Sequence, residues 1–149
     1  MKKIIFALLC LTLLLAFTGC NRSKVTMILD FEVTDVQNIE IFKFIVPMEA
    51  KGMTVTESKD IEQIITAFSE IRIKRDAIDG DETVGCEVLS FRFNMEDGKE
   101  FVIAYWDDVL RNSNGINYKV SKNSLESLWN NLNYDKKSVS ESELPIINK

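Results

Sequence analysis

The side chains best placed for acid–base chemistry are two neighbouring carboxylates, Asp107 and Asp108, which follow Trp106 in the stretch YWDDV. Two carboxylates that converge on one bond are the groups with which glycosidases cleave sugars. Neighbouring residues of a strand point to opposite faces, so these two acids do not converge if the stretch DDVLR is extended. We therefore expect a strand end with its aromatic ring packed and its acids in water.

A second group of acids lies in the loop DAIDGDET and could offer oxygen ligands to calcium. Its members are Asp76, Asp79, Asp81 and Glu82. An EF-hand loop needs acids at its first, third and fifth positions and glycine at its sixth. Counting from Asp76 puts Ile78 third and Gly80 fifth, so the spacing fails. We predict a solvated turn and no metal site.

Nucleophilic catalysis needs a nucleophile and a base that activates it. Cys86 is the one cysteine outside the first twenty residues, and the chain contains no histidine. A Cys–His pair is therefore impossible, and a buried cysteine at a strand end usually packs as a small hydrophobe. A GxSxG motif and a glycine-rich phosphate loop are also absent from the sequence. We predict no catalytic residue and no cofactor, and we leave a redox role of Cys86 open.

The beginning of the chain has the form of an export signal. Lys2 and Lys3 precede an apolar stretch from Ile4 to Phe17, about fourteen residues long. A helix that spans a bilayer needs about 20 apolar residues, whereas the apolar part of a signal peptide is shorter and is followed by small residues at the cleavage site. Thr18 and Gly19 supply those small residues, directly before Cys20. The start of the chain therefore predicts a signal peptide.

The stretch FTGC resembles the bacterial lipobox, which is read by lipoprotein signal peptidase, with Phe17 at the position where leucine is commonest. The resemblance implies a diacylglyceryl group on the sulfur of Cys20, cleavage before Cys20, and in some cases a further acyl chain on the new N-terminus. Two fatty chains hold a protein firmly on a membrane, whereas one chain gives marginal binding. The alternative is an ordinary signal peptide whose cleavage site falls near a cysteine.

The composition limits the classes of partner. Removal of residues 1–19 takes away Lys2 and Lys3 and leaves 16 basic and 23 acidic side chains, a formal net charge of −7. Such an acidic chain does not suit nucleic acid, whose phosphates require a basic surface, and it is not drawn to an anionic membrane by charge. The remaining 130 residues suffice for one domain with its own core. That domain cannot contain an internal disulfide, because Cys20 is assigned to lipid and Cys86 is then alone.

Alternation of apolar and polar residues predicts most of the remaining elements as strands. These are residues 25–33, 39–46, 53–56, 71–75, 88–95, 100–106, 107–111 and 116–120. The stretch at 34–38 looks like a turn, the Asp97–Gly98 pair predicts a hairpin, and NSNG at 112–115 predicts a second hairpin.

Two stretches change to the helical period of 3.6 residues. The first has apolar residues at Ile61, Ile64, Ile65 and Phe68, with Ser58 as a cap. The second has apolar residues at Leu125, Leu128, Trp129 and Leu132, with a capping box formed by Asn123 and Glu126. Each narrow stripe needs an apolar surface, which the alternating strands provide. We therefore predict an α+β fold with two layers, in which two amphipathic helices cover one face of a mostly antiparallel sheet.

The expected organisation is a signal peptide at 1–19, a lipidated tether at 20–24, one α+β domain at 25–135 and a disordered tail at 136–149. The chain resembles small lipoproteins of Gram-positive bacteria that form families of unknown function. The stretches that carry this resemblance are Glu57 to Ile65, Phe93 to Phe101 and Ile116 to Trp129. The resemblance implies no activity that can be transferred to individual residues.

These observations predict a lipid-anchored protein on the extracytoplasmic face of the cell membrane, held there through Cys20. Its expected role is a non-enzymatic binding or accessory module for an unknown protein or small ligand, and not for nucleic acid. The alternative is a carboxylate-dependent enzyme that acts on sugar or peptide of the cell envelope, which requires two acids in one cleft.

Overall fold

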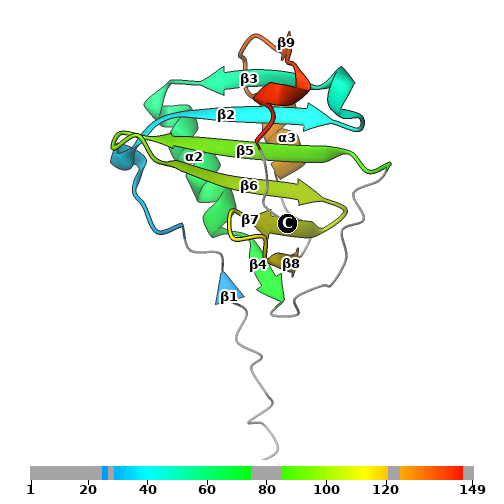
Figure 1. The fold of residues 1–149 in the computed structure, drawn as a ribbon. Coiled ribbons are helices and arrows are strands. Elements are labelled where there is room, and N and C mark those ends of the chain that lie inside the picture. Colours follow the sequence, from blue (N-terminus) through cyan, green and yellow to red (C-terminus); the bar gives the residue numbers. More distant parts are fainter. Residues whose placement is uncertain (1–24, 27–28, 75–84, 121–124, 146–149) are drawn as a thin grey trace, which may run out of the picture.

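The computed structural model describes residues 25–26, 29–74, 85–120 and 125–145 (Figure 1). Several predicted features lie outside these residues: the signal peptide, Cys20 and the tether, the acidic loop from Asp76 to Glu82, and the capping residue Asn123. Within the described residues, no helix has the length and apolar character that crossing a bilayer requires.

Nine strands of the described part form one antiparallel sheet with the order β1-β4-β8-β7-β6-β5-β2-β3-β9. The strands are β1 (Val25–Thr26), β2 (Val36–Phe44), β3 (Lys51–Val55), β4 (Arg72–Lys74), β5 (Val88–Met95), β6 (Glu100–Trp106), β7 (Val109–Asn112), β8 (Asn117–Val120) and β9 (Lys137–Ser138). The predicted α+β fold with a mostly antiparallel sheet is confirmed. Strands β2, β5 and β6 are the longest and lie next to one another in the sheet.

The two α-helices are α2 (Ser58–Ser69) and α3 (Leu125–Asn131), and both lie behind the sheet in the view of Figure 1. Three short 3₁₀ helices, η1 (Val33–Asp35), η2 (Pro47–Glu49) and η3 (Glu141–Glu143), lie in connections. Helix α2 begins at Ser58 itself, and Glu57 occupies the N-cap position predicted for Ser58.

The main core forms between these helices and one set of alternating strand side chains. Ile61, Ile64 and Phe68 of α2 are buried in it, as are Leu125, Leu128, Trp129 and Leu132 of α3 and its continuation. The ring of Phe68 meets the rings of Phe91 and Phe93 edge-on, at centroid distances of 4.9 and 5.7 Å. Aromatic pairs in this geometry contribute about 0.5–1.5 kcal/mol beyond the area that they bury.

The predicted strand at 25–33 is wrong over residues 29–33. The structure assigns β1 to Val25–Thr26, leaves residues 29–32 irregular and begins η1 at Val33. The apolar side chains that suggested a strand reach the core from a loop. Phe31, for example, lies 5.3 Å from Phe93 and 5.5 Å from Phe101, measured between ring centroids. The alternating pattern therefore predicted correctly that Leu29, Phe31 and Val33 pack against the core, but it predicted the wrong backbone conformation.

The predicted strand at 107–111 begins two residues too early. Asp107 and Asp108 form a two-residue turn between β6 and β7, with positive φ angles of 42° and 63°. Short hairpins favour this left-handed backbone because it matches the twist of the strands, and aspartate tolerates it better than most residues. The argument that these acids point to opposite faces of a strand therefore does not apply, and both are exposed.

The structure also differs from the disordered tail predicted for residues 136–149. Residues 137–145, which we call the strap, pair with β3 through β9 and then cross in front of β2 and β5 (Figure 1). The part of the tail that the structure describes is therefore packed on the sheet, and the folded unit continues past the predicted boundary at residue 135. The strap is held by residues that are distant in the sequence, among them Gly52 and Arg92.

Candidate functional site

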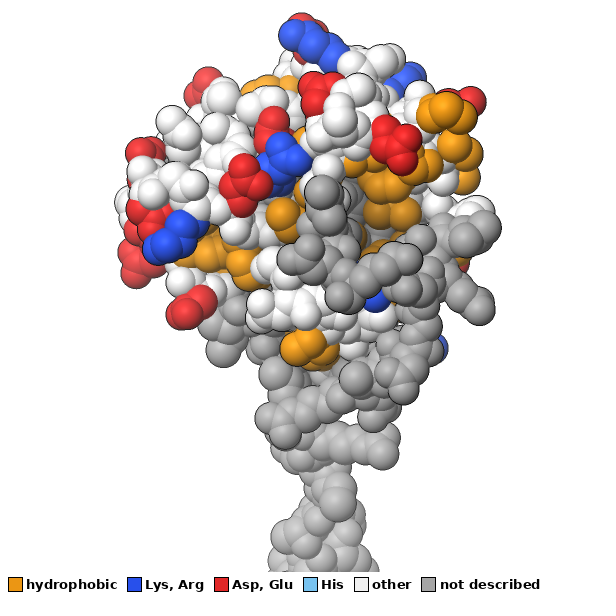
Figure 2. Space-filling model, in the orientation of Figure 1, with side chains coloured by type: hydrophobic (Ala, Val, Ile, Leu, Met, Phe, Trp, Pro, Cys, Tyr) orange, Lys and Arg blue, Asp and Glu red, His pale blue; other side chains and the backbone are white. Residues whose placement is uncertain are grey.

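The strap crosses the side of the sheet that points away from the main core, which we call the strap face. Its side chains alternate with the core side chains along β2, β5 and β6; they include Glu40, Phe42, Phe44, Val88, Ser90, Arg92, Asn94, Val102, Ala104 and Trp106. Figure 2 shows charged side chains of both signs close together beside the strap, and hydrophobic side chains on its other side.

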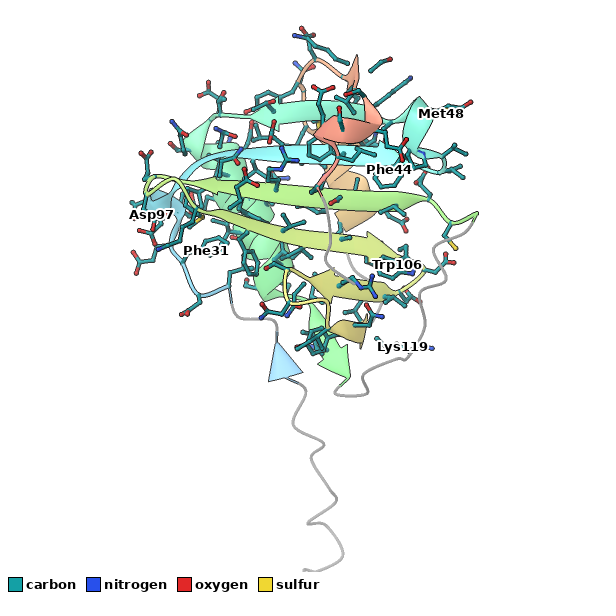
Figure 3. All side chains as sticks on the ribbon, in the orientation of Figure 1. Phe31, Phe44, Met48, Asp97, Trp106 and Lys119 are labelled. Atoms are coloured by element: carbon teal, nitrogen blue, oxygen red, sulfur yellow. The ribbon has the colours of Figure 1, made fainter. Side chains whose placement is uncertain are left out.

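The apolar part of the strap face is a small cluster of its own. Val88, Ala104 and Trp106 are buried there, and Phe44, Cys86 and Val109 pack against them. Phe44, Trp106 and the exposed Met48 lie at the same end of the sheet (Figure 3).

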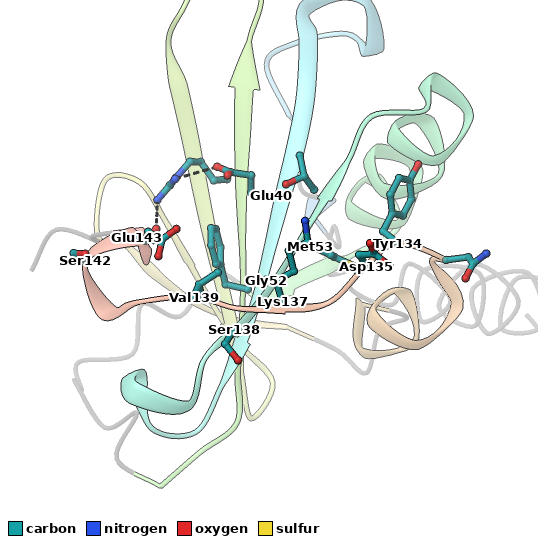
Figure 4. A pocket seen from close by; sticks show the side chains of 14 residues that line it. Glu40, Gly52, Met53, Tyr134, Asp135, Lys137, Ser138, Val139, Ser142 and Glu143 are labelled. Atoms are coloured by element: carbon teal, nitrogen blue, oxygen red, sulfur yellow. Dashed lines mark hydrogen bonds and ion pairs between the residues drawn. The ribbon is translucent and has the colours of Figure 1, made fainter.

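A hollow of about 830 Å³ lies beside the strap (Figure 4). Three groups of residues line it: Glu40, Phe42, Gly52, Met53, Thr54 and Arg92 from the sheet, Asn133, Tyr134 and Asp135 after α3, and Lys137, Ser138, Val139, Ser142 and Glu143 from the strap. Ligand pockets commonly have volumes of about 300–1,000 Å³. The hollow is therefore the candidate site.

Arg92 holds the polar part of this site together. Its Nη1 donates to Oε2 of Glu40 at 3.0 Å, and its Nη2 donates to the backbone carbonyl of Glu143 at 2.7 Å (Figure 4). The guanidinium also lies over the ring of Phe42, 5.2 Å from its centroid. Nε of Arg92 is buried without a hydrogen bond in the described structure, and the carboxylate of Glu100 is 3.7 Å away, too far for one.

Glu40 and Arg92 meet because they are cross-strand partners in the register of β2 and β5. Asn94, two pairs further along and on the same face of the sheet, donates to Oε2 of Glu40 at 3.2 Å and to Oδ1 of Asn38 at 2.7 Å. The carboxylate of Glu40 therefore accepts hydrogen bonds from two side chains of β5 and is held in place before any ligand arrives.

Gly52 receives the strap at the edge of the sheet. A Cβ atom at this position would lie 3.0 Å from Cγ1 of Val139 and 3.3 Å from the ring of Phe42. The N–H of Val139 donates to the carbonyl of Ala50 at 3.1 Å. The absence of a side chain at Gly52 thus makes a notch that the side chain of Val139 fills.

Tyr134 fixes the beginning of the strap to α2. Its hydroxyl donates to Oδ2 of Asp60 at 2.8 Å and accepts from the N–H of Glu57 at 3.2 Å. Burial of the ring and the hydrogen bond to the Asp60 carboxylate raise the pKa of the Tyr134 hydroxyl above its usual value. The hydroxyl therefore stays protonated and keeps this contact over the physiological pH range.

The other end of the strap contains a turn that is held by its own side chains. The carboxylate of Glu143 accepts from the N–H of Ser140 at 2.7 Å and from its hydroxyl at 2.6 Å. These two hydrogen bonds lower the pKa of the Glu143 carboxyl, so it is ionised at neutral pH. A carboxylate held in this way is poorly suited to act as a general acid, which must carry a proton.

Among the residues that the sequence singled out, the structure brings Cys86 and Asp107 together. The thiol of Cys86 donates to Oδ2 of Asp107 at 2.8 Å. That hydrogen bond, with burial and the negative charge of Asp107, raises the pKa of the Cys86 thiol. Because the thiolate is the reactive form, this environment makes Cys86 a poor nucleophile.

The acidic loop, for which we predicted a solvated turn and no metal site, lies outside the described residues, so that prediction stays untested. In the described parts of the chain, no group of three or more acids, cysteines or histidines is close enough to hold a metal ion. Cys20, the predicted lipidation site, also lies outside them.

Sequence reasoning missed Glu40, Arg92 and Gly52, which build the candidate site. The sequence does contain a feature that marks Glu40 and Arg92: each is a charged residue within a strand rich in apolar residues, IEIFKF and SFRFN. Their pairing depends on the register between β2 and β5, and the role of Gly52 depends on the path of the strap.

Comparisons of the chain with models of protein families, with curated proteins and with solved structures find no match. The functional argument therefore depends on the site itself.

Proposed function

We propose that this protein is a lipid-anchored binding module on the extracytoplasmic face of the cell membrane, and that the hollow beside the strap holds its ligand. The observation that carries the proposal is the hollow itself, about 830 Å³ in volume and lined by charged, amide and hydroxyl side chains from the sheet and the strap. A concave surface with a few convergent polar groups is the usual form of a binding site.

The proposal includes the finer architecture expected from the sequence, two layers with both helices on one face of the sheet. That arrangement leaves the strap face available to a ligand, because the helices then bury only the core side of the sheet. The buried helix residues that share one core with Ile39, Phe91 and Ile103 support it.

Binding is favoured over the carboxylate-dependent enzyme by the hydrogen bonds that two acids of the hollow, Glu40 and Glu143, already accept. Glu40 accepts from Arg92 and Asn94, and Glu143 accepts twice from Ser140. A glycosidase needs one carboxyl that is protonated at neutral pH, whereas the pKa of Glu143 is lowered. The side chains of the hollow thus suit recognition more than proton transfer.

The anchor part of the proposal uses Cys20 and the five-residue tether from 20 to 24. A fully extended tether of this length spans about 17 Å. Lipid on Cys20 would keep β1, which begins at Val25, within that distance of the membrane surface. Because the mature chain is acidic, lipid and not surface charge would have to provide the attachment.

Two measurements test the anchor. Mass spectrometry of the protein from its native membrane is expected to find an acylated N-terminal Cys20 without residues 1–19. The variant Cys20→Ser is expected to leave the membrane fraction. An unmodified thiol at Cys20, or a Cys20→Ser protein that remains on the membrane, contradicts the lipid anchor.

A photo-reactive amino acid tests the binding site in cells. At Thr54, an exposed residue that lines the hollow, it is expected to give an adduct that increases the mass of the protein. At Asn114, an exposed residue in the turn between β7 and β8, the same amino acid is the matched control and is expected to give none. Equal yields at both positions, or no adduct at Thr54, contradict a ligand in the hollow.

A further inference from the structure

We propose that the strap occupies a groove that binds an extended peptide, and that a partner peptide binds by taking the place of the strap. This inference rests on the proposed function and names its ligand class: a polypeptide segment in extended form, with a branched aliphatic residue followed by polar residues. Such a peptide would contact the sheet residues of the hollow, Gly52 and Arg92 among them, in place of the strap residues that line it now.

The first argument is the backbone pairing at the edge of the sheet. The strap pairs antiparallel with β3 through two residue pairs, Lys51 with Ser138 and Gly52 with Lys137. The N–H of Val139 continues this pairing by donating to the carbonyl of Ala50. Addition of a strand to a sheet edge is a common way to bind peptides, because backbone hydrogen bonds do not depend on the sequence of the peptide.

The second argument is the notch at Gly52, which selects a side chain. Cγ1 of Val139 lies where a Cβ of residue 52 would meet it at 3.0 Å, against the ring of Phe42. The notch therefore holds a branched aliphatic side chain, and any residue larger than glycine at position 52 would compete with it.

The third argument is the contact at Arg92. Its Nη2 binds a backbone carbonyl, four residues after Val139 in the strap, and not a side chain. The carboxylates of Glu40 and Glu100 lie 3.0 and 3.7 Å from the same guanidinium. Two acids close to one arginine disfavour a third, so this position fits the neutral backbone of a peptide better than an anionic group.

Within the described residues, the hydrogen bonds that hold the strap and the residues just before it are concentrated toward its beginning. Tyr134, three residues before the strap, ties the chain to Asp60 of α2 and to the N-cap residue Glu57. From Ser140 onward, the one hydrogen bond that we find between the described strap and the sheet is that from Arg92 to Glu143. The proposal therefore takes the part of the strap from Ser140 onward as the part that leaves the sheet first.

Competition between strap and peptide gives a quantitative expectation. A segment that is part of the same chain acts at an effective concentration in the millimolar range. A peptide in solution at micromolar concentration competes poorly with it until the strap is cut from the chain. The uncut protein is therefore expected to bind such a peptide at least tenfold more weakly than the cut protein.

The test uses the full chain with a protease site inserted between Asp135 and Lys136. The probe is a fluorescent synthetic peptide with the sequence of residues 136–145, and its anisotropy measures binding before and after cleavage. Saturable binding after cleavage, and at least tenfold weaker binding before it, supports the proposal. A peptide with aspartate in place of Val139, and the cleaved Arg92→Gln protein, are both expected to lower the affinity at least tenfold.

The result that overturns the proposal is a cleaved protein that keeps its circular-dichroism spectrum and does not bind the probe, or binds it no better than the uncut protein. If the insertion prevents folding, hydrogen exchange on the unaltered chain decides. Exchange of the Val139 amide at least tenfold faster than that of the β5 amides supports a displaceable strap. Equal rates contradict it. A failure here, together with a Thr54 adduct in cells, would refute the peptide groove and leave the proposed binding function in place.

Discussion

The substitution Gly52→Ala tests how the strap is held, because the new methyl group enters the notch. Its carbon would lie 3.0 Å from Cγ1 of Val139, whereas carbon atoms in good contact are about 3.5–4.0 Å apart. Val139 must therefore give way by a few tenths of an ångström, which strains its 3.1 Å hydrogen bond to Ala50. Loss of such a hydrogen bond raises the free energy of the attached strap by about 1 kcal/mol relative to the detached one, in favour of detachment.

We expect this cost to appear in the opening of the strap and not in global unfolding. An opening free energy lower by about 1 kcal/mol corresponds to about fivefold faster hydrogen exchange at the Val139 amide. Global unfolding changes less, because alanine restricts the unfolded chain and recovers about 0.4–1 kcal/mol. Hydrogen exchange followed by mass spectrometry, with urea unfolding of the same samples, measures both quantities.

The matched control is Thr54→Ala, which changes an exposed residue on the same strand without entering the notch. Its Val139 amide is expected to exchange at the rate of the unaltered protein. If Gly52→Ala also leaves that rate unchanged, the notch does not hold the strap and the reasoning fails.

Three further substitutions test other contacts of the structure. Tyr134→Phe removes the hydroxyl that binds Asp60 and is expected to lower the free energy of unfolding by about 1 kcal/mol in urea titrations; no change would mean that this contact does not anchor the root of the strap. Asp107→Gly removes the acceptor that raises the pKa of Cys86, so alkylation of the thiol at pH 8 is expected to become faster, whereas Asp108→Gly, the control in the same turn, is expected to leave it unchanged. The sign follows because a raised pKa leaves less thiolate at that pH, and an unchanged rate in Asp107→Gly would contradict it. Ser90→Ala removes a hydroxyl that is 1% exposed and has no hydrogen-bond partner in the described structure, so unfolding is expected to require about 1 kcal/mol more; a less stable variant would show that the hydroxyl is satisfied.

Elements whose signals are local could be predicted from the sequence. The stripes at Ile61–Phe68 and Leu125–Leu132 predicted the buried sides of both helices, because helical spacing alone decides which side chains share a face. The Asp97–Gly98 pair predicted the hairpin between β5 and β6, and Gly98 has the positive φ of 82° that such a turn requires.

The elements that were predicted wrongly depend on contacts that are distant in the sequence. Phe31 belongs to the core because Phe93 and Phe101 receive it, some sixty or seventy residues later in the chain. The strap has a polar composition that is typical of disorder, with three serines and two glutamates from Ser138 to Glu143. Its attachment depends on Ala50, Gly52 and Arg92, and no local pattern reveals these partners.

The apolar character of β2 and β6 indicates why a strap is useful to this fold. Both strands carry hydrophobic side chains on both faces: Ile41 and Ile103 in the main core, and Phe42 and Ala104 on the strap face. A two-layer arrangement would cover only the first set with helices, and an uncovered apolar sheet face invites unwanted association. A polar segment lies across this face, held by its pairing with β3, by the notch at Gly52 and by Arg92, and the proposed peptide would take its place. The contacts that stabilise the resting protein are then the same contacts that would select its partner.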